Sequence, residues 1–301
     1  MIKKARVIVL GTGAATRKFI LDNVANRYIE IMGIILDGSV EADDNKEFIN
    51  GIRTELGHDI EEYSFALDSM QKADIVFSTE YRCFIPEEFT NSALIVNCHG
   101  GLLPKWRGAC ANAWAIMNDE KEVGFTIHRV RTGMDDGEIY FQKRIGIRHD
   151  QTYADVHNEM LEGIASEVPK VLYDVVCGNN KGEAQPTSGF VFCSKFTRAM
   201  GDISGFERDS EYYVNLYRCM SKPLGTGIWF NYRGDRYDVG KVENAKNFGV
   251  IDYLGIPGKV VNIQNGKMFV KTKDNAVVLS EITKDEISIE PDLFFRNGNK
   301  L

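Results

Sequence analysis

Short apolar runs separated by helical patterns in the first hundred residues limit the fold of this chain more than any other feature. Each run is long enough for one strand, and most end at glycine or polar residues. Strands buried on both faces of a parallel sheet have this near-continuous apolar character. The pattern predicts an α/β fold with a doubly wound, Rossmann-like, mostly parallel sheet. The runs are Ala5–Leu10, Ile29–Leu36, Ala73–Ser78 and Ala93–Val96, with helical patterns at residues 16–26 and 46–55.

The pattern changes in the second half of the chain. Two strands, Glu122–Val130 and Glu138–Ile147, are predicted around a glycine-flanked turn, followed by a long amphipathic helix over Thr152–Val176. Beyond Gly205, short runs alternate with glycine-rich turns, which is typical of a small antiparallel barrel. We therefore expect a Rossmann-like domain over residues 1–204 and a small C-terminal β-barrel-like (OB-like) domain over residues 205–301.

Charge and cysteine usage exclude several classes of protein. The 301 residues carry a formal net charge of −7, and residues 206–301 hold nearly equal numbers of basic and acidic side chains. Such a chain is not built around nucleic acid or an anionic membrane surface. The six cysteines include no CxxC pair, so neither a disulfide framework nor a zinc site is indicated. No stretch is long enough for a membrane span, and we expect a cytoplasmic protein.

Two polar clusters carry the chemistry that this sequence offers. Asn97 and His99 follow the fourth predicted strand, where ligands bind in parallel sheets, and Asp135 lies in the later turn, Gly133–Gly137. On its own, His99 is most simply a histidine satisfied by hydrogen bonds, and carboxylates in a turn are usually solvated. A fold that brings the turn to the end of the fourth strand would instead place an acid beside the imidazole.

Asparagine, histidine and aspartate together suit the transfer of an acyl group to an amine. The Asn97 amide and a protonated His99 can stabilise an oxyanion. His99 can take the proton that the attacking nitrogen loses, and Asp135 can orient the imidazole. No serine or cysteine occupies a nucleophile motif, and Cys98 is expected to pack in the core.

The motifs NCHGGLLPKWRG (97–108), GFTIHR (124–129) and GMDDGEIYFQ (133–142) resemble the signature of folate-dependent formyltransferases. That family includes methionyl-tRNA, glycinamide ribonucleotide and nucleotide-aminosugar formyltransferases. The resemblance implies that Asn97, His99 and Asp135 form the catalytic trio. Asp136 competes with Asp135, which fits the family's position better.

The resemblance also implies binding sites for substrates. Residues 77–85 resemble the segment that holds the pterin ring, and residues 214–230 resemble the entry into the family's C-terminal domain. 10-Formyltetrahydrofolate is the implied cosubstrate, with no metal. Implied folate contacts are Arg82, Cys83, Phe84, Ile85, Leu103, Met134, Asp136 and Gly137, and implied contacts of the amine substrate are Gly13, Gly101, Lys105 and Arg107.

Some positions depart from the family or admit simpler interpretations. The family usually has serine at Gly101 and proline at Ala111, which puts the geometry of this loop in doubt. Lys105 and Arg107 could meet a phosphate or the folate tail, or be solvated surface charges. Residues 11–16 begin like a dinucleotide fingerprint but lack its third glycine, so a tight turn or a substrate contact is the better interpretation. His128 is expected to be structural or to line the substrate.

The acceptor amine is left open between branches of the family. Methionyl-tRNA formyltransferases carry a basic insertion after the second strand, whereas residues 37–62 here are acidic. This favours a nucleotide-linked amino sugar, with tRNA or a small amine such as a hydroxyornithine as alternatives. Sugar-modifying members are often dimers, so a homodimer is open. A non-enzymatic alternative is also open, namely that the chain is an inert OB-type binding module.

Overall fold

The chain divides into two units, and the computed structural model describes residues 3–301. Each unit gathers segments that are distant in the sequence. The predicted division into residues 1–204 and 205–301 stays a prediction. Unit 1 comprises the chain up to Asn112 with Glu122–Gly146 and His157–Cys193, and unit 2 comprises Ala113–Lys121, Ile147–Val156 and Ser194–Leu301.

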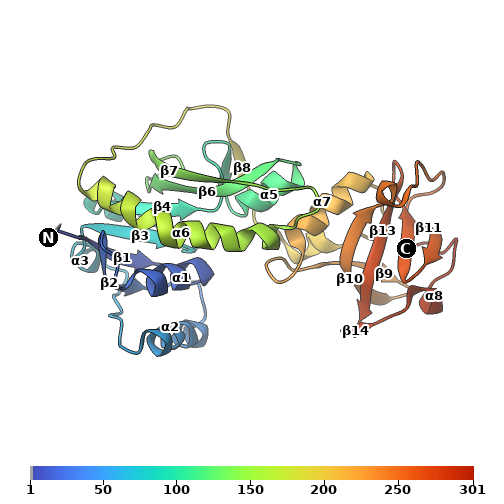
Figure 1. The fold of residues 1–301 in the computed structure, drawn as a ribbon, viewed down its shortest axis with the longest axis horizontal. Coiled ribbons are helices and arrows are strands. Elements are labelled where there is room, and N and C mark those ends of the chain that lie inside the picture. The colour runs from blue at the N-terminus through green and yellow to red at the C-terminus, as the bar shows by residue number, and fades with distance from the viewer. Residues whose placement is uncertain (1–2) are drawn as a thin grey trace. The chain divides into compact units, whose positions relative to one another are not determined.

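Six strands form the sheet of unit 1, in the order β2-β1-β3-β4-β6-β7 (Figure 1). The first four are mutually parallel, whereas β6 runs antiparallel to β4 and β7 runs antiparallel to β6. The predicted mostly parallel, Rossmann-like sheet is thereby confirmed. The strands are β1 (Ala5–Leu10), β2 (Ile29–Ile35), β3 (Ile75–Thr79), β4 (Ile95–His99), β6 (Glu122–Arg129) and β7 (Ile139–Gly146).

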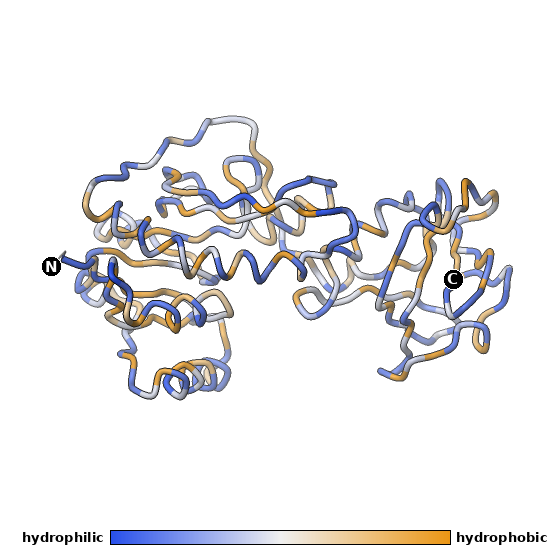
Figure 2. The backbone as a smooth tube through the Cα atoms, viewed as in Figure 1, coloured by the Kyte–Doolittle hydropathy of each residue, from blue (hydrophilic) through white to orange (hydrophobic). Residues whose placement is uncertain are grey.

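The centre of this sheet is its most hydrophobic part. β1 and β3 are almost wholly buried and apolar, whereas the helix over Ala42–Leu56 is largely hydrophilic (Figure 2). Phe19 packs against Phe77 with ring centroids 4.6 Å apart, which joins the first helix to β3. The apolar runs in the sequence thus become the central strands because only these are covered on both faces.

One strand is longer than the sequence suggested. β4 was expected to end at Val96, but it continues through Asn97 and Cys98 to His99. These polar residues extend the strand because β6 pairs with them, matching Asn97 to His128 and His99 to Thr126. The site residues therefore lie on the sheet itself rather than on a loop beyond it.

The helices and short strands that accompany this sheet agree with the alternating pattern. A short parallel pair, β5 (Trp106–Gly108) with β8 (Val191–Cys193), forms a second small sheet. Gly163 on α6 lies so close to Phe125 on β6 that a Cβ there would be 3.0 Å from the ring. The helices are α1 (Ala14–Asn23), α2 (Ala42–Leu56), α3 (Leu67–Met70), α4 (Glu87–Ser92), α5 (Ala111–Met117) and α6 (Tyr153–Val176).

Unit 2 holds a separate antiparallel sheet in the order β11-β12-β13-β10-β9, with β14 paired to β13. The predicted antiparallel C-terminal domain is confirmed, while closure into a barrel stays a prediction. Helix α7 (Ser210–Met220) was not predicted. The strands are β9 (Ile228–Tyr232), β10 (Asp235–Asn244), β11 (Val260–Gln264), β12 (Lys267–Lys271), β13 (Ala276–Lys284) and β14 (Ile287–Ser288), and short helices cover Arg198–Gly201 (η1), Ala245–Phe248 (η2) and Pro291–Phe294 (α8).

Within residues 3–301, no helix is both long enough and apolar enough to span a bilayer.

Candidate active site

Neighbouring strands bring three polar side chains together. Asn97 and His99 are two residues apart on β4, so their side chains lie on the same face. β6 places His128 directly opposite Asn97, and the Asn97 Nδ2 atom lies 3.3 Å from Nε2 of His128. The His128 Nδ1 atom lies 2.9 Å from the Arg129 carbonyl oxygen. If Nδ1 carries the proton, Nε2 is free to accept from the asparagine amide.

Asp135 reaches this face from the turn between β6 and β7. Its Oδ2 lies 3.4 Å from Nδ1 of His99 and accepts a hydrogen bond of 2.7 Å from the backbone N–H of Gly108. Its Oδ1 lies 3.5 Å from Nε2 of His128. The neighbouring Asp136 instead folds back over Gly133 in its own turn. The structure thus puts Asp135, and not Asp136, beside the imidazoles.

The pKa values in this group follow from burial and from the pairing of charges. Burial alone would raise the pKa of Asp135, but the neighbouring imidazoles of His128 and His99 and the Gly108 N–H lower it to about 2. Burial lowers the pKa of His99, which is only 6% exposed, although the Asp135 carboxylate opposes this shift. Asp135 is therefore ionised and His99 neutral at pH 7.

A neutral His99 carries one N–H, and its surroundings favour one place for it. Nε2 lies 2.7 Å from the carbonyl oxygen of Trp106, which can only accept a hydrogen bond. The proton then sits on Nε2, and Nδ1 faces Asp135 as a free acceptor. A proton arriving at Nδ1 would convert this contact into an ion pair.

A cavity of about 450 Å³ opens on this group. Asn97, His128 and Asp135 line it, while His99 lies behind them. Of the predicted folate contacts, Arg82, Cys83, Phe84, Ile85 and Met134 line the cavity. Leu103, Asp136 and Gly137 do not. The other lining residues are Ser78, Tyr81, Gly108, Val130, Arg131, Thr132 and Gly133.

A buried aspartate shapes one wall of the cavity. Asp37 is fully buried and accepts hydrogen bonds from the backbone N–H of Arg82 at 2.8 Å and from the Cys83 thiol at 3.3 Å. It also accepts from the N–H and hydroxyl of Ser39. The bonds outweigh burial, so the pKa of Asp37 is lowered. These contacts hold the segment that lines the cavity.

Gly101 and Ala111, the two residues that depart from the family pattern, lie against each other. A Cβ at Gly101 would lie 2.5 Å from the Cβ of Ala111 and 2.8 Å from Nε2 of His99. No side chain fits at this position as the loop stands. Gly101 thus allows close packing of the loop around His99 rather than presenting a surface to the cavity.

Residues 57–172 match the formyl transferase family, and residues 196–297 match the formyl transferase C-terminal domain. The chain belongs to the formyltransferase family. A methionyl-tRNA formyltransferase of Lactobacillus acidophilus is 28% identical over 208 residues, which cover 68% of this chain but only 64% of that relative.

Two solved structures share the fold of this family member over nearly their whole length. WlaRD, a sugar 3N-formyl transferase crystallised with dTDP and 5-N-formyl-THF, has a TM-score of 0.67 at 17% identity and covers 94% of this chain and 99% of its own. An N-formyltransferase from Helicobacter canadensis, in complex with folinic acid and dTDP-3-aminofucose, has a TM-score of 0.66 at 15% identity, covering 92% and 99%.

The glycine-containing loop at residues 11–16 of this formyltransferase-family chain is occupied by a side chain of the same protein. The Glu80 carboxylate accepts hydrogen bonds from the backbone N–H groups of Ala15 at 2.8 Å and Thr16 at 3.2 Å, in the first turn of α1. A Cβ at Gly13 would lie 2.1 Å from Glu80 Oε2. Gly13 therefore faces the Glu80 carboxylate. The helix end that binds phosphate in dinucleotide-binding proteins is occupied here by a side chain.

The two basic residues of the 97–108 motif differ from each other. Lys105 is exposed, and its Nζ lies 4.9 Å from the ring centroid of Trp106. Arg107 is only 6% exposed, and its guanidinium lies 4.2 Å from the ring centroid of Phe190. The interpretation of Arg107 as a solvated surface charge is wrong, because β5 pairs with β8 and carries the side chain inward.

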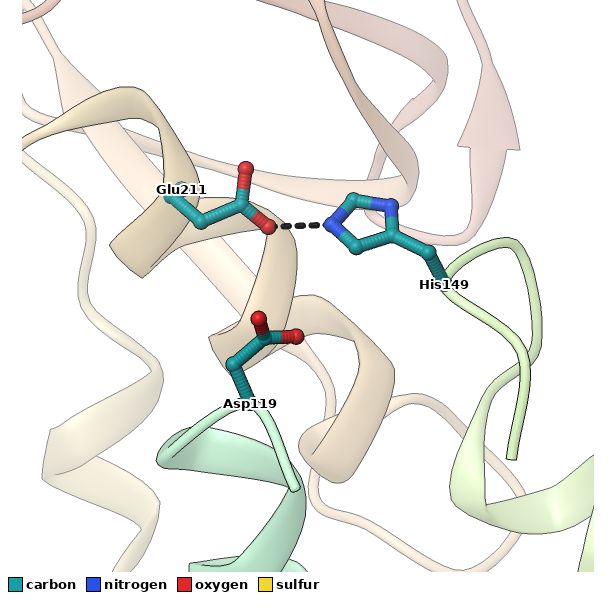
Figure 3. A group of neighbouring side chains, drawn as sticks. All are labelled: Asp119, His149 and Glu211. Atoms are coloured by element: carbon teal, nitrogen blue, oxygen red, sulfur yellow. Dashed lines mark hydrogen bonds and ion pairs between the residues drawn. The ribbon is translucent and has the colours of Figure 1, made fainter. Parts of the chain in front are cut away.

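His149 lies beside two carboxylates in unit 2. It forms an ion pair with Glu211, and Asp119 lies next to both (Figure 3). Lys121 Nζ is 2.8 Å from Asp119 Oδ2, and Arg218 Nη1 is 3.9 Å from Asp119 Oδ1. Because Lys121 and Arg218 lie beside Asp119 and His149 pairs with Glu211, we interpret the group as a network of ion pairs.

Proposed function

We propose that this chain transfers a formyl group from 10-formyltetrahydrofolate to the amine of a nucleotide-linked amino sugar. The arrangement of Asn97, His99 and Asp135 at one end of the cavity is the observation that supports the reaction. This part of the proposal also draws on the family to which the chain belongs.

The cavity has the chemistry that a pterin ring requires. Phe84 is 75% exposed, and Met134 is also exposed, so two large apolar side chains stand at its wall without cover. A planar ring would remove this surface from water. Arg82 and Cys83, which line the cavity beside Phe84, are held in place by Asp37. When bound, the folate supplies an activated formyl group.

Each member of the trio has a role that its contacts support. One N–H of the Asn97 amide faces His128, which leaves the second to donate to an oxyanion at the formyl carbon. The amine nitrogen forms the new bond to that carbon and loses a proton, for which Nδ1 of His99 is the free acceptor. Asp135, ionised at neutral pH, then stabilises the imidazolium. The imidazolium then returns this proton to the folate nitrogen as the bond between that nitrogen and the formyl carbon breaks, which restores neutral His99.

An amino sugar is the acceptor that charge favours. The chain has a net charge of −7, and α2, which follows β2, begins with Asp43 and Asp44. A protein that holds tRNA needs a basic surface. The two sugar-modifying structures also match this chain over almost their full length.

Methionyl-tRNA is the second candidate, because the curated relatives similar in sequence are methionyl-tRNA formyltransferases. The two candidates differ in the size and charge of the acceptor. They share the trio and the folate cavity, so the mechanism above applies to both.

Turnover with a panel of acceptors tests the proposal. Purified protein would be mixed with 10-formyltetrahydrofolate and dTDP-, UDP- or GDP-linked amino sugars, and release of tetrahydrofolate followed by absorbance, with His99→Ala as the control. We expect turnover with one sugar that is lost in the variant. If only charged initiator tRNA is formylated, tRNA takes the place of the amino sugar as the acceptor. If no amine is formylated, the result favours a binding module.

A further inference from the structure

Gln185, fifty residues away in the sequence, holds the turn that carries Asp135. Its Nε2 donates hydrogen bonds to the carbonyl oxygen of Asp135 at 2.8 Å and to that of Gly137 at 2.7 Å. Its Oε1 accepts a hydrogen bond of 2.8 Å from Nη2 of Arg107. Both amide N–H groups and the oxygen of one side chain are thus engaged with two separate segments.

The chemistry of these partners determines which way the amide points. Carbonyl oxygens only accept hydrogen bonds, and a guanidinium only donates them. The opposite orientation of Gln185 would set its oxygen against two carbonyls and its NH₂ against Arg107. The amide therefore has one acceptable orientation, in which both donors face the Asp135 turn.

Arg107 holds the oxygen of the Gln185 side-chain amide. Its side chain is 6% exposed and lies over the ring of Phe190. Within residues 3–301, it forms no ion pair with a carboxylate, and its Nε has no hydrogen-bond partner. A buried charge needs the acceptors that it has. Gln185 is therefore held firmly from the Arg107 side.

The Asp135 turn needs such support. Asp135 has a φ of 49°, in the left-handed region that is strained for a residue with a side chain. Its carboxylate lies 3.4 Å from one imidazole and 3.5 Å from the other. A displacement of about 1 Å would break both contacts, and displacements of that size are costly to catalysis.

We propose that Gln185 is a positioning residue that sets the Asp135 carboxylate against His99 by binding the backbone on either side of Asp136. The inference rests on the proposed function for its kinetic consequence. The geometry itself can be tested without any substrate.

Two substitutions separate positioning from simple support of Arg107. Gln185→Glu keeps an acceptor for Arg107 but loses both donors to the turn and sets a carboxylate against two carbonyl oxygens. Gln185→Met removes all three hydrogen bonds. Gln71→Ala, an exposed glutamine in unit 1, is the matched control. We expect kcat to fall at least tenfold in both Gln185 variants, with KM for the formyl donor changed less than threefold and the control unchanged.

A readout without turnover accompanies the kinetics. The N–H of Gly108 donates to Asp135 Oδ2, so its hydrogen exchange should accelerate at least tenfold in Gln185→Glu. The NMR titration of His99 should also move to lower pH, because the carboxylate that favours its protonated form is displaced. Melting temperatures measured alongside show whether each variant is folded.

The outcomes are distinct. If Gln185→Glu exchanges and titrates like the wild-type protein, or turns over like it, Gln185 only supports Arg107 and the inference is wrong. If the wild-type protein shows no turnover with any amine, the proposed function fails, while exchange and titration still decide whether Gln185 sets the position of Asp135.

Discussion

At the scale of single residues, the site is assembled from side chains of β4, of β6 and of the turn that follows β6. Asn97, His99 and Asp135 occupy two dense polar clusters, and the structure brings them together. His128 joins them only because β6 pairs antiparallel with β4, which a sequence does not specify residue by residue. Gln185 lies in a segment without helix, strand or periodicity, so no local pattern pointed to it.

We predict that Gly101→Ser lowers both stability and activity. The new side chain would overlap Ala111 and His99, and overpacking of this kind costs about 1–3 kcal/mol. Because His99 must move, turnover should fall more than tenfold. Thermal unfolding and kcat would be measured beside Gly146→Ser, where an added side chain meets no atom within 4 Å. Normal activity in Gly101→Ser would show that the loop adapts.

The titration of His99 gives a prediction with a definite sign. Burial lowers the pKa of His99 below 6.5, so its ring should become protonated only in more acidic solution. The Asp135 carboxylate opposes the shift, and Asp135→Asn should therefore lower this pKa further. NMR titration of the ring nitrogens, assigned with His99→Gln, measures both. An apparent pKa above 6.5 in the wild-type protein, or a rise in Asp135→Asn, would contradict the prediction.

At the scale of elements, the apolar runs predicted strands well, and tertiary pairing decided where they end. β4 continues into Asn97, Cys98 and His99 because β6 satisfies their backbone groups. Helix α7 was not predicted, although its apolar residues recur at helical spacing and eight of its eleven residues are buried. It lies among short, glycine-punctuated runs that indicate strands, and these outweighed the helical spacing.

The N-terminus of α7 depends on a side chain from a distant turn. Asp274 accepts hydrogen bonds from the N–H and the hydroxyl of Ser210, at 2.7 and 2.9 Å. Asp274→Ala should lower the free energy of unfolding of unit 2 by about 1 kcal/mol. Chemical denaturation measures this, with the exposed Asp252→Ala as the control.

The same contact predicts a pH dependence. Burial would raise the pKa of Asp274, but its hydrogen bonds outweigh this and lower the pKa to about 2 from 3.8. Its contribution to stability is therefore complete above pH 3.8 and is lost as the pH falls toward 2. The difference in stability between the wild-type protein and Asp274→Ala should shrink over that range, and a constant difference would exclude this origin.

The wall of the cavity should also depend on one carboxylate. Asp37→Ala leaves the backbone N–H of Arg82 and the Cys83 thiol without their acceptor. We expect KM for the formyl donor to rise about tenfold, since each lost bond to a charged group is worth about 1.5–3 kcal/mol and part of that loss falls on folding. The exposed Asp44→Ala serves as the control. A change in kcat with an unaltered KM for the formyl donor would show that Asp37 does not act through the wall of the cavity.

At the scale of the whole molecule, the sequence predicted the two kinds of sheet but not how the chain is shared between them. Unit 2 includes Ala113–Lys121 and Ile147–Val156 as well as the C-terminal segment. Such an arrangement depends on contacts between distant residues, and it has no signature in composition. Charge is different, because it is a property of the chain as a whole and can be read before any fold is known.

The net charge of −7 leads to a prediction about partners. Affinity for tRNA comes largely from basic residues that displace counterions, so we expect no retention of initiator tRNA at micromolar protein and 150 mM salt. Filter binding measures this, with an authentic methionyl-tRNA formyltransferase as the positive control. Tight binding that weakens steeply with salt would favour tRNA as the acceptor.

The Glu80 carboxylate at α1 also has a meaning for how such folds diverge. A group tethered to the chain acts at an effective concentration on the order of millimolar or more, so a free anion of equal intrinsic affinity at lower concentration would not displace it. The N-terminus of α1 can either bind the side chain that follows β3 or bind a ligand, and the residue at position 80 decides between the two. A change at residue 80 would therefore trade a structural contact for an open anion site without redrawing the backbone.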